Sequence, residues 1–292
     1  MVFGRLLTAM VTPFDKNLEV DYRKAQELAE HLISNGNDGV VVAGTTGESP
    51  TLSKSEKIKL FQAIKEAVGN KGQVIAGTGS NSTKDSIELT KAAEEIGVDG
   101  VMLVVPYYNK PPQGALYQHF ATIAENTSLP ILLYNVPGRT STNMLPDTVF
   151  KLSQIPNIIA IKEAAGDMDQ VSAIKSLVSD EFLIFSGDDS LTLPILSLGG
   201  HGIISVAGHV VGKEIKAMID FYLEGKIQDA QKVHQKLFPV FRTMFITTNP
   251  IPVKTAVNLI GLDVGELRLP MISATEEQKS KISEVLKAVG KI

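Results

Sequence analysis

The chain is dominated by one pattern, an alternation of short apolar, β-branched runs with longer amphipathic stretches from Leu6 to about Ser205. This alternation is typical of βα units on a parallel sheet, because each buried strand is followed by a helix that packs against it. The apolar runs predict eight strands: Leu6–Val11, Gly39–Ala43, Gln73–Ala76, Gly100–Val105, Ile131–Tyr134, Ile158–Ile161, Leu183–Phe185 and Gly202–Ser205. Eight such units predict an α/β fold of the closed (β/α)8 type, the TIM barrel.

The stretches between these runs predict helices, several of which begin at a Ser, Thr or Asp suited to an N-cap. They include Asp21–Ser34, Ser53–Ala67, Thr83–Ile96, Gly114–Asn126 and Pro146–Leu152. An open doubly wound sheet is the competing architecture, but such sheets often carry a glycine-rich loop after the first strand. Here the first run is followed by Thr12-Pro13-Phe14, which favours the barrel.

After Ser205 the pattern predicts four helices with no strand between them: Lys213–Leu223, Ile227–Phe245, Val253–Ile260 and Thr275–Val289. We therefore expect a catalytic barrel domain over residues 1–225 and a C-terminal helical domain over residues 226–292. Asn249-Pro250-Ile251-Pro252 is expected to form a rigid turn within that second domain.

Composition excludes several classes of protein. The formal net charge of −4 and the pI of about 5.8 provide no basic field for nucleic acid or anionic lipid. The sequence has no Cys, so disulfides, thiolate metal ligands and a thiol nucleophile are excluded. Residues 1–14 are too short for a signal peptide or membrane span and are expected to contain the first strand. These features predict a soluble, cytoplasmic protein.

Lys162 directly follows the apolar run Ile158–Ile161, at the end of a predicted strand. Catalytic residues of βα barrels lie at the carboxyl ends of the strands. Burial there would lower the pKa of the lysine, and the neutral amine is a nucleophile for carbonyl groups. The alternative is a structural lysine paired with Glu163. The eight-strand count and the polar residues after neighbouring strands favour the catalytic interpretation.

Other strand ends offer matching groups. Tyr134 ends the fifth run, one strand from Lys162, so its phenol could transfer a proton, although a core tyrosine would look the same. Thr45 and Thr46 lie on a glycine-flanked loop that could bind a small anion through backbone N–H and hydroxyl groups. Arg139 follows Tyr134 in a Pro-Gly turn and could hold a second carboxylate, although exposed arginines are common.

Other chemistry is not supported. The five histidines have no metal-binding spacing, so neither a metal site nor a cofactor is predicted. Gly77-Thr78-Gly79-Ser80-Asn81 lacks the third glycine of a dinucleotide-binding loop and is interpreted as a βα turn. Asp188-Asp189 suits helix capping better than magnesium binding.

The strand-end motifs together resemble those of the dihydrodipicolinate synthases, within the N-acetylneuraminate lyase superfamily. The resemblance covers essentially the whole chain. It rests on Gly44-Thr45-Thr46-Gly47-Glu48-Ser49, Pro106-Tyr107-Tyr108-Asn109, Tyr134-Asn135-Val136-Pro137-Gly138-Arg139-Thr140, Ile161-Lys162-Glu163-Ala164 and Asn249-Pro250-Ile251-Pro252-Val253-Lys254.

The resemblance implies the condensation of pyruvate with aspartate semialdehyde in lysine and diaminopimelate biosynthesis. Lys162 would form the imine with pyruvate, with Tyr134 as proton shuttle and Thr45 as its hydrogen-bonded link. Tyr108 would reach into the site of a neighbouring subunit of a homotetramer, a dimer of dimers. Substrate-binding positions would be Thr45 and Thr46 for the pyruvate carboxylate, Arg139 for the semialdehyde carboxylate, and Gly187 and Ile204 through their backbones.

Feedback-inhibited relatives bind lysine at a dimer interface, and the resemblance also locates that site. The matching positions here are Ser49, Pro50, Lys54, Lys57, Asn81, Asp85 and Tyr107. Lys54 and Lys57 stand where inhibitable relatives tend to have histidines, and three-residue spacing puts both on one helix face. Because two extra ammonium groups repel a cationic effector, we expect insensitivity to lysine.

Two alternatives remain at this point. The first is a sister aldolase of the superfamily, such as a sialic acid or sugar-acid lyase, which would share Lys162 and Tyr134. Arg139 argues against it, because a polyol-binding lyase is expected to have a small or hydroxyl residue there. The second is a non-catalytic binding barrel, which would be favoured only if the lysine, tyrosine or threonines were missing.

Overall fold

The computed structural model describes residues 3–292 and has eight parallel strands that close into a barrel in chain order. The strands are β1 (Leu6–Ala9), β2 (Gly39–Val42), β3 (Gln73–Gly77), β4 (Gly100–Val104), β5 (Ile131–Asn135), β6 (Ile158–Glu163), β7 (Leu183–Ser186) and β8 (Gly202–Ser205). The predicted eight-stranded barrel is therefore confirmed.

Helices fill the segments between the strands, and the last four follow β8. They are α1 (Tyr22–Ser34), α2 (Lys54–Val68), α3 (Thr83–Ile96), α4 (Gln113–Ala124), α5 (Pro137–Thr140), α6 (Pro146–Ser153), α7 (Met168–Leu177), α8 (Thr192–Ser197), α9 (Gly208–Leu223), α10 (Ile227–Thr243), α11 (Ile251–Leu259) and α12 (Glu276–Ala288). Two short 3₁₀ helices, η1 (Ser49–Thr51) and η2 (Asp189–Leu191), follow β2 and β7.

Side-chain caps fix where several helices begin. The Asp21 carboxylate accepts from the Lys24 N–H at the start of α1, as the sequence predicts. Ser53 and Glu56 form a capping box at α2, in which each side chain accepts from the other residue's backbone N–H. The Asp188 carboxylate accepts from the Ser190 N–H at η2, which confirms capping as a use of the Asp188-Asp189 pair.

The chain forms two compact units. One consists of Ile75–Ile204, and the other of the described part of Met1–Val74 together with Ser205–Ile292. In the first unit, β4, β5, β6 and β7 pair in parallel, and their residues are almost all buried. This continuous burial is characteristic of strands covered on both faces.

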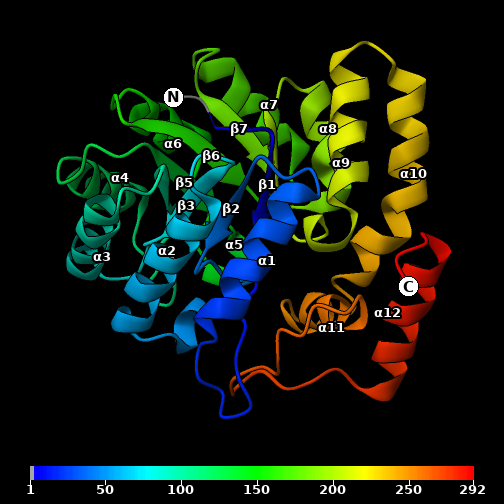
Figure 1. The fold of residues 1–292 in the computed structure, drawn as a ribbon. Helices are drawn as coiled ribbons and strands as arrows, with labels where there is room; N and C mark the ends of the chain where they lie inside the picture. Colours follow the sequence, from blue (N-terminus) through cyan, green and yellow to red (C-terminus); the bar gives the residue numbers. More distant parts are fainter. Residues whose placement is uncertain (1–2) are drawn as a thin grey trace. The chain divides into compact units, whose positions relative to one another are not determined.

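In the second unit, α9 and α10 pack side by side, and α11 packs against α12 (Figure 1). The helix predicted from Lys213 begins earlier, at Gly208, and it is interrupted by a non-helical Val211. As the sequence predicts, residues 206–292 contain no strand. The predicted division into a 1–225 barrel domain and a 226–292 helical domain stays a prediction.

The turn predicted over Asn249–Pro252 is wrong in its second half. Asn249 and Pro250 precede α11, but Ile251 and Pro252 are the first two residues of that helix. Proline is tolerated there because the first N–H groups of a helix have no intrahelical partner and the ring already holds a helical φ. Pro252 therefore belongs to the first turn of a helix, whereas Asn249 and Pro250 lie in the turn before it.

The sequence predicts neither a membrane span nor a signal peptide in residues 1–14. Within the described residues no helix is long and apolar enough to cross a membrane. Met1 and Val2, the beginning of the segment interpreted above as too short for a signal peptide or span, lie outside the described residues.

Gly79, in the loop after β3, generates a stability prediction. A Cβ atom at Gly79 would lie 2.4 Å from the Val104 backbone nitrogen, whereas one at Gly114, on α4, would meet nothing within 4 Å. Gly79→Ala is expected to lower the free energy of unfolding by about 1–3 kcal/mol, the usual cost of overpacking. Gly114→Ala, the matched control, should be neutral or stabilising. Urea unfolding of both variants measures this, and equal stabilities would contradict the close packing at Gly79.

Candidate active site

Lys162 and Tyr134 lie side by side at the carboxyl ends of β6 and β5. The strands extend slightly beyond the predicted ends, so that both residues belong to the sheet and are register partners across the two strands. Register partners in parallel strands project to the same side, and the Lys162 Nζ lies 4.4 Å from the centre of the Tyr134 ring. The predicted proximity of these two residues is therefore found.

The environment of Lys162 favours the neutral amine. Its side chain is buried, and burial lowers its pKa to about 8. The Asp189 carboxylate opposes this shift and the Arg139 guanidinium adds to it, both with smaller effects. The neutral amine, which is the form that a nucleophile requires, is consequently far more populated near neutral pH than in an ordinary lysine.

Glu163 is not the partner of Lys162. Because successive strand residues point to opposite faces, Glu163 faces away and accepts from Asn135 Nδ2 at 3.0 and 3.2 Å, from Gln170 Nε2 at 3.0 Å and from the Ala165 N–H at 2.7 Å. Among the described residues no ion pair joins Glu163 to Lys162. Burial raises the pKa of Glu163, and these hydrogen bonds oppose the rise.

The remaining predicted residues near strand ends in this unit have different environments. Arg139 is exposed and lies in the short helix α5, directly after β5. Gly187 follows β7, where its N–H donates to the Glu163 carbonyl at 2.8 Å and a Cβ would meet Ala164 at 2.5 Å. Ile204 is fully buried in β8.

The loop after β4 presents Tyr108 to solvent. Tyr108 is 90% exposed and has a φ of 73°, a left-handed conformation that is costly for a bulky residue. Its neighbours are anchored, since Asn81 Nδ2 donates to the Tyr107 carbonyl at 3.2 Å and Asn109 Nδ2 to the Asn81 carbonyl at 2.9 Å. The structure thus brings together Asn81 and Tyr107, and it places exposed Asp85 in the first turn of α3.

Thr45 and Thr46 lie on a tight loop after β2 in the other unit. The loop turns through backbone bonds from the N–H groups of Gly47 and Ser49 to the Gly44 carbonyl, at 3.1 and 3.3 Å. Thr45 is half-buried, whereas Thr46 is buried and its Oγ1 accepts from Asn249 Nδ2 at 3.0 Å. The loop continues into half-buried Ser49 and exposed Pro50, and α2 then carries exposed Lys54 and half-buried Lys57.

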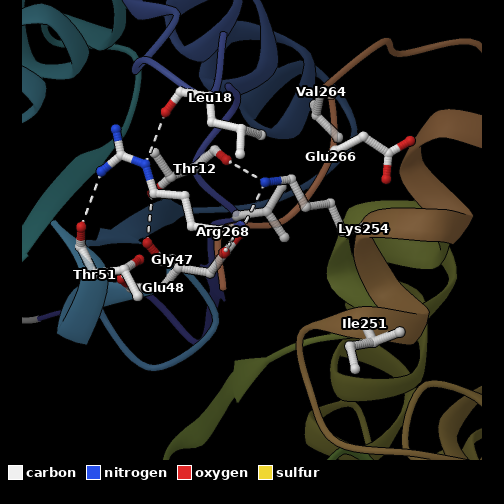
Figure 2. A network of polar contacts seen from close by, with 12 residues as sticks. Thr12, Leu18, Gly47, Glu48, Thr51, Ile251, Lys254, Val264, Glu266 and Arg268 are labelled. Carbon is white, nitrogen blue, oxygen red and sulfur yellow. Dashed lines mark hydrogen bonds and ion pairs between the residues drawn. The ribbon is translucent and has the colours of Figure 1, made fainter. Parts of the chain in front are cut away.

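Glu48, at the end of the same loop, forms a buried ion pair with Lys254 of α11 (Figure 2). Lys254 Nζ donates to Glu48 Oε1 at 2.8 Å and to the Thr12 carbonyl at 2.9 Å, and it lies 4.1 Å from the centre of the Phe14 ring. Burial lowers the pKa of Lys254, and Glu48 opposes this. The pairing of Lys254 with Glu48 cannot be predicted from the sequence, because the two residues are 206 positions apart.

Arg268 completes the contacts around this loop. Its backbone N–H donates to Glu48 Oε2 at 3.0 Å, and its guanidinium donates to the carbonyls of Leu18 and Thr51 (Figure 2). The guanidinium also pairs with Glu56 at 2.6 Å, which lowers the pKa of Glu56 to about 2. The segment after residue 248 therefore holds the Thr45–Thr46 loop through several charged contacts.

The described residues contain no group of three or more His, Cys, Asp or Glu side chains arranged to hold a metal ion. The first unit brings an amine and a phenol into contact. This pair of groups suits carbonyl chemistry by covalent catalysis.

The Glu48–Lys254 pair leads to a second stability prediction. Lys254→Met leaves the Glu48 carboxylate buried without its cation, so the free energy of unfolding is expected to fall by about 3–5 kcal/mol. Adding Glu48→Gln removes the uncompensated charge, and the double variant is expected to regain about 2 kcal/mol. Denaturant unfolding of the three proteins measures both effects. A double variant no more stable than Lys254→Met would show that the charge is not the cause.

Comparison with known proteins agrees over the whole chain. The model of the dihydrodipicolinate synthetase family matches residues 2–289. A curated relative from Heliobacterium modesticaldum, named 4-hydroxy-tetrahydrodipicolinate synthase, is 57% identical over 290 residues, which are 99% of this chain and 97% of the relative.

Solved structures give the same result. Dihydrodipicolinate synthase from Cyanidioschyzon merolae with lysine bound superposes with a TM-score of 0.98 at 47% identity, covering 99% of both chains. The chloride-inhibited enzyme from Acinetobacter baumannii complexed with pyruvate superposes with a TM-score of 0.96 at 38% identity, covering 100% of both chains. The chain therefore belongs to the dihydrodipicolinate synthetase family.

Proposed function

We propose that this protein is a 4-hydroxy-tetrahydrodipicolinate synthase, a lyase that condenses pyruvate with L-aspartate 4-semialdehyde in lysine and diaminopimelate biosynthesis. Relatives of that name match nearly the full length of the chain. The observation that carries the mechanism is the buried Lys162 amine, with its pKa lowered to about 8, in contact with Tyr134.

Lys162 is the proposed nucleophile. Its neutral amine adds to the C2 carbonyl of pyruvate and loses water to form an imine, a Schiff base. Loss of a methyl proton gives the enamine, whose carbon attacks the aldehyde of the second substrate and forms the new carbon–carbon bond. The substrate amine then displaces Lys162 from C2 as the product ring closes, which restores the free lysine.

Tyr134 is the proposed proton shuttle for these steps. Imine formation and aldol addition both move protons at oxygen and nitrogen, and a phenol can donate and accept them. Its ring lies beside the Lys162 amine, where such transfers begin. Thr45 is proposed to be the hydrogen-bonded link through which Tyr134 passes protons.

The carboxylates of the two substrates need separate donors. Thr45 and Thr46 are proposed to hold the pyruvate carboxylate, and Arg139 the semialdehyde carboxylate, for which a guanidinium provides two parallel donors. Gly187 and Ile204 are proposed to contribute backbone groups.

Tyr108 is proposed to act in a neighbouring subunit of a homotetramer. Its 90% exposure and strained φ support this role, because strained backbone of this kind persists where function requires it. Both the tetramer and a cytoplasmic location stay predictions.

The sister-aldolase alternative is less well supported. Arg139 lies directly after β5, where a polyol-cleaving lyase is expected to have a small or hydroxyl residue. The non-catalytic alternative requires the loss of Lys162, Tyr134, Thr45 or Thr46, and all four are present.

The proposal is tested by assaying the purified chain with pyruvate and aspartate semialdehyde and identifying the product by mass spectrometry. Lys162→Ala is expected to abolish turnover, and Lys151→Ala, a change at an exposed surface lysine, to leave it unchanged. Cleavage of sialic or sugar acids without condensation would favour the sister aldolase instead.

Tyr134→Phe is expected to lower kcat by about 10²–10⁴-fold, the usual worth of a positioned proton-transfer group. The phenylalanine ring retains the packing against Lys162, so the free energy of unfolding should change little. Steady-state kinetics and denaturant unfolding measure the two effects. A nearly normal kcat would show that Tyr134 is a structural residue of the core and not the proton shuttle.

The enzyme is proposed to be insensitive to millimolar L-lysine, because Lys54 and Lys57 at the proposed effector site repel a cationic ligand. Each of the two repulsive contacts is expected to weaken lysine binding about tenfold. Inhibition curves of the natural enzyme and of the Lys54→His/Lys57→His double variant test this. The variant is expected to become more sensitive. Half-inhibition of the natural enzyme below 1 mM, on the order of the affinity of a functional effector site, would show that the site tolerates both lysines.

A further inference from the structure

We propose that Asn249 is a positioning residue that fixes the direction of the Thr46 hydroxyl, so that its proton points to the substrate carboxylate. This inference rests on the proposed function, in which Thr46 binds pyruvate. It concerns a residue that precedes α11, far in the sequence from the Thr45–Thr46 loop.

The contact is short, direct and buried. Asn249 Nδ2 donates to Thr46 Oγ1 at 3.0 Å, and Thr46 and Asn249 are 3% and 5% exposed. Among residues 3–292 this amide is the one hydrogen-bonding partner of the Thr46 side chain. The Thr46 hydroxyl is thus removed from bulk water, and within the described part of the protein it accepts a hydrogen bond but donates none.

The chemistry of the two groups decides the direction of the bond. An amide nitrogen is only a donor, whereas a threonine hydroxyl has one proton and two acceptor lone pairs. Thr46 must therefore accept from Asn249, and its proton remains available for a different acceptor. A carboxylate is an acceptor only, so it is the kind of substrate group that this arrangement suits.

The surroundings of the loop hold its backbone in place. Thr12 Oγ1 donates to the Gly47 carbonyl at 2.6 Å, and the buried Glu48–Lys254 pair ties the end of the loop to α11, which follows Asn249 by one residue. A donor held in place before the substrate arrives loses little entropy on binding, which increases affinity.

The test replaces Asn249 by groups of opposite hydrogen-bonding character. In Asn249→Asp the ionised carboxylate accepts the Thr46 proton and withdraws it from the substrate. The KM for pyruvate is expected to rise about tenfold or more, with kcat nearly unchanged. Asn249→Ala leaves the proton free and should have a smaller effect. Gln235→Glu, an amide-to-carboxylate substitution at an exposed position of α10, is the matched control and should change neither constant.

A double-mutant cycle separates direction from general damage. Thr46→Val removes the hydroxyl, so adding Asn249→Asp to it should raise KM no further if the two residues act through their bond. The inference would be overturned if Asn249→Asp raised the KM for pyruvate as much in Thr46→Val as in the natural enzyme. It would also be overturned if the KM of Asn249→Asp were no higher than that of Asn249→Ala. Thermal unfolding of each variant shows whether it is folded. If Asn249→Asp is not folded, the same double-mutant cycle is carried out with Asn249→Ala.

Reductive trapping keeps this inference distinct from the proposed function. Borohydride with pyruvate should place an adduct on Lys162 of the natural enzyme. The pyruvate concentration that gives half of the maximal adduct should be higher in Asn249→Asp. Absence of the adduct in the natural enzyme would reject the proposed function itself. An adduct with unchanged half-saturation in Asn249→Asp would reject only the positioning role.

Discussion

Burial of the Lys162 amine at the end of β6 is the constraint on which the proposed chemistry depends. Water stabilises an ammonium group strongly, so a buried lysine either finds a carboxylate or gives up its proton more readily. Here the adjacent carboxylate, Glu163, faces away and is occupied by Asn135 and Gln170. Asp189 opposes the shift only in part, and the pKa of Lys162 is lowered to about 8.

The Thr45–Thr46 loop depends on a different use of buried charge. Glu48 and Lys254 are both almost fully buried, yet each satisfies the other and also bonds to backbone, Glu48 to the Arg268 N–H and Lys254 to the Thr12 carbonyl. Such pairs add little net stability compared with apolar residues, but they permit few alternative arrangements of the loop. The charged contacts therefore serve to fix geometry where the substrate is proposed to bind.

The barrel, its strands and the pairing of Lys162 with Tyr134 could be predicted because they follow from local hydrophobic patterns and from the rule that functional groups lie at strand ends. The Asn249–Thr46 and Lys254–Glu48 contacts could not, because they join residues more than 200 positions apart and no periodicity records them. Pro252 was assigned to a turn because proline usually marks one, yet at the first turn of α11 the ring is compatible with a helix. The roles of Tyr108, Gly187 and Ile204 rest on the family resemblance alone, which names a residue but gives neither the orientation of its side chain nor the contacts that hold it.

The most direct test of the central claim is the pH dependence of reductive trapping, with the adduct located by peptide mapping. The rate of borohydride-dependent modification by pyruvate should rise with pH as the Lys162 ammonium loses its proton, and level off above a midpoint near pH 8. The adduct should map to Lys162 alone. A midpoint above about 10, the range of an unperturbed lysine, or an adduct on another residue would contradict the conclusion that burial activates Lys162.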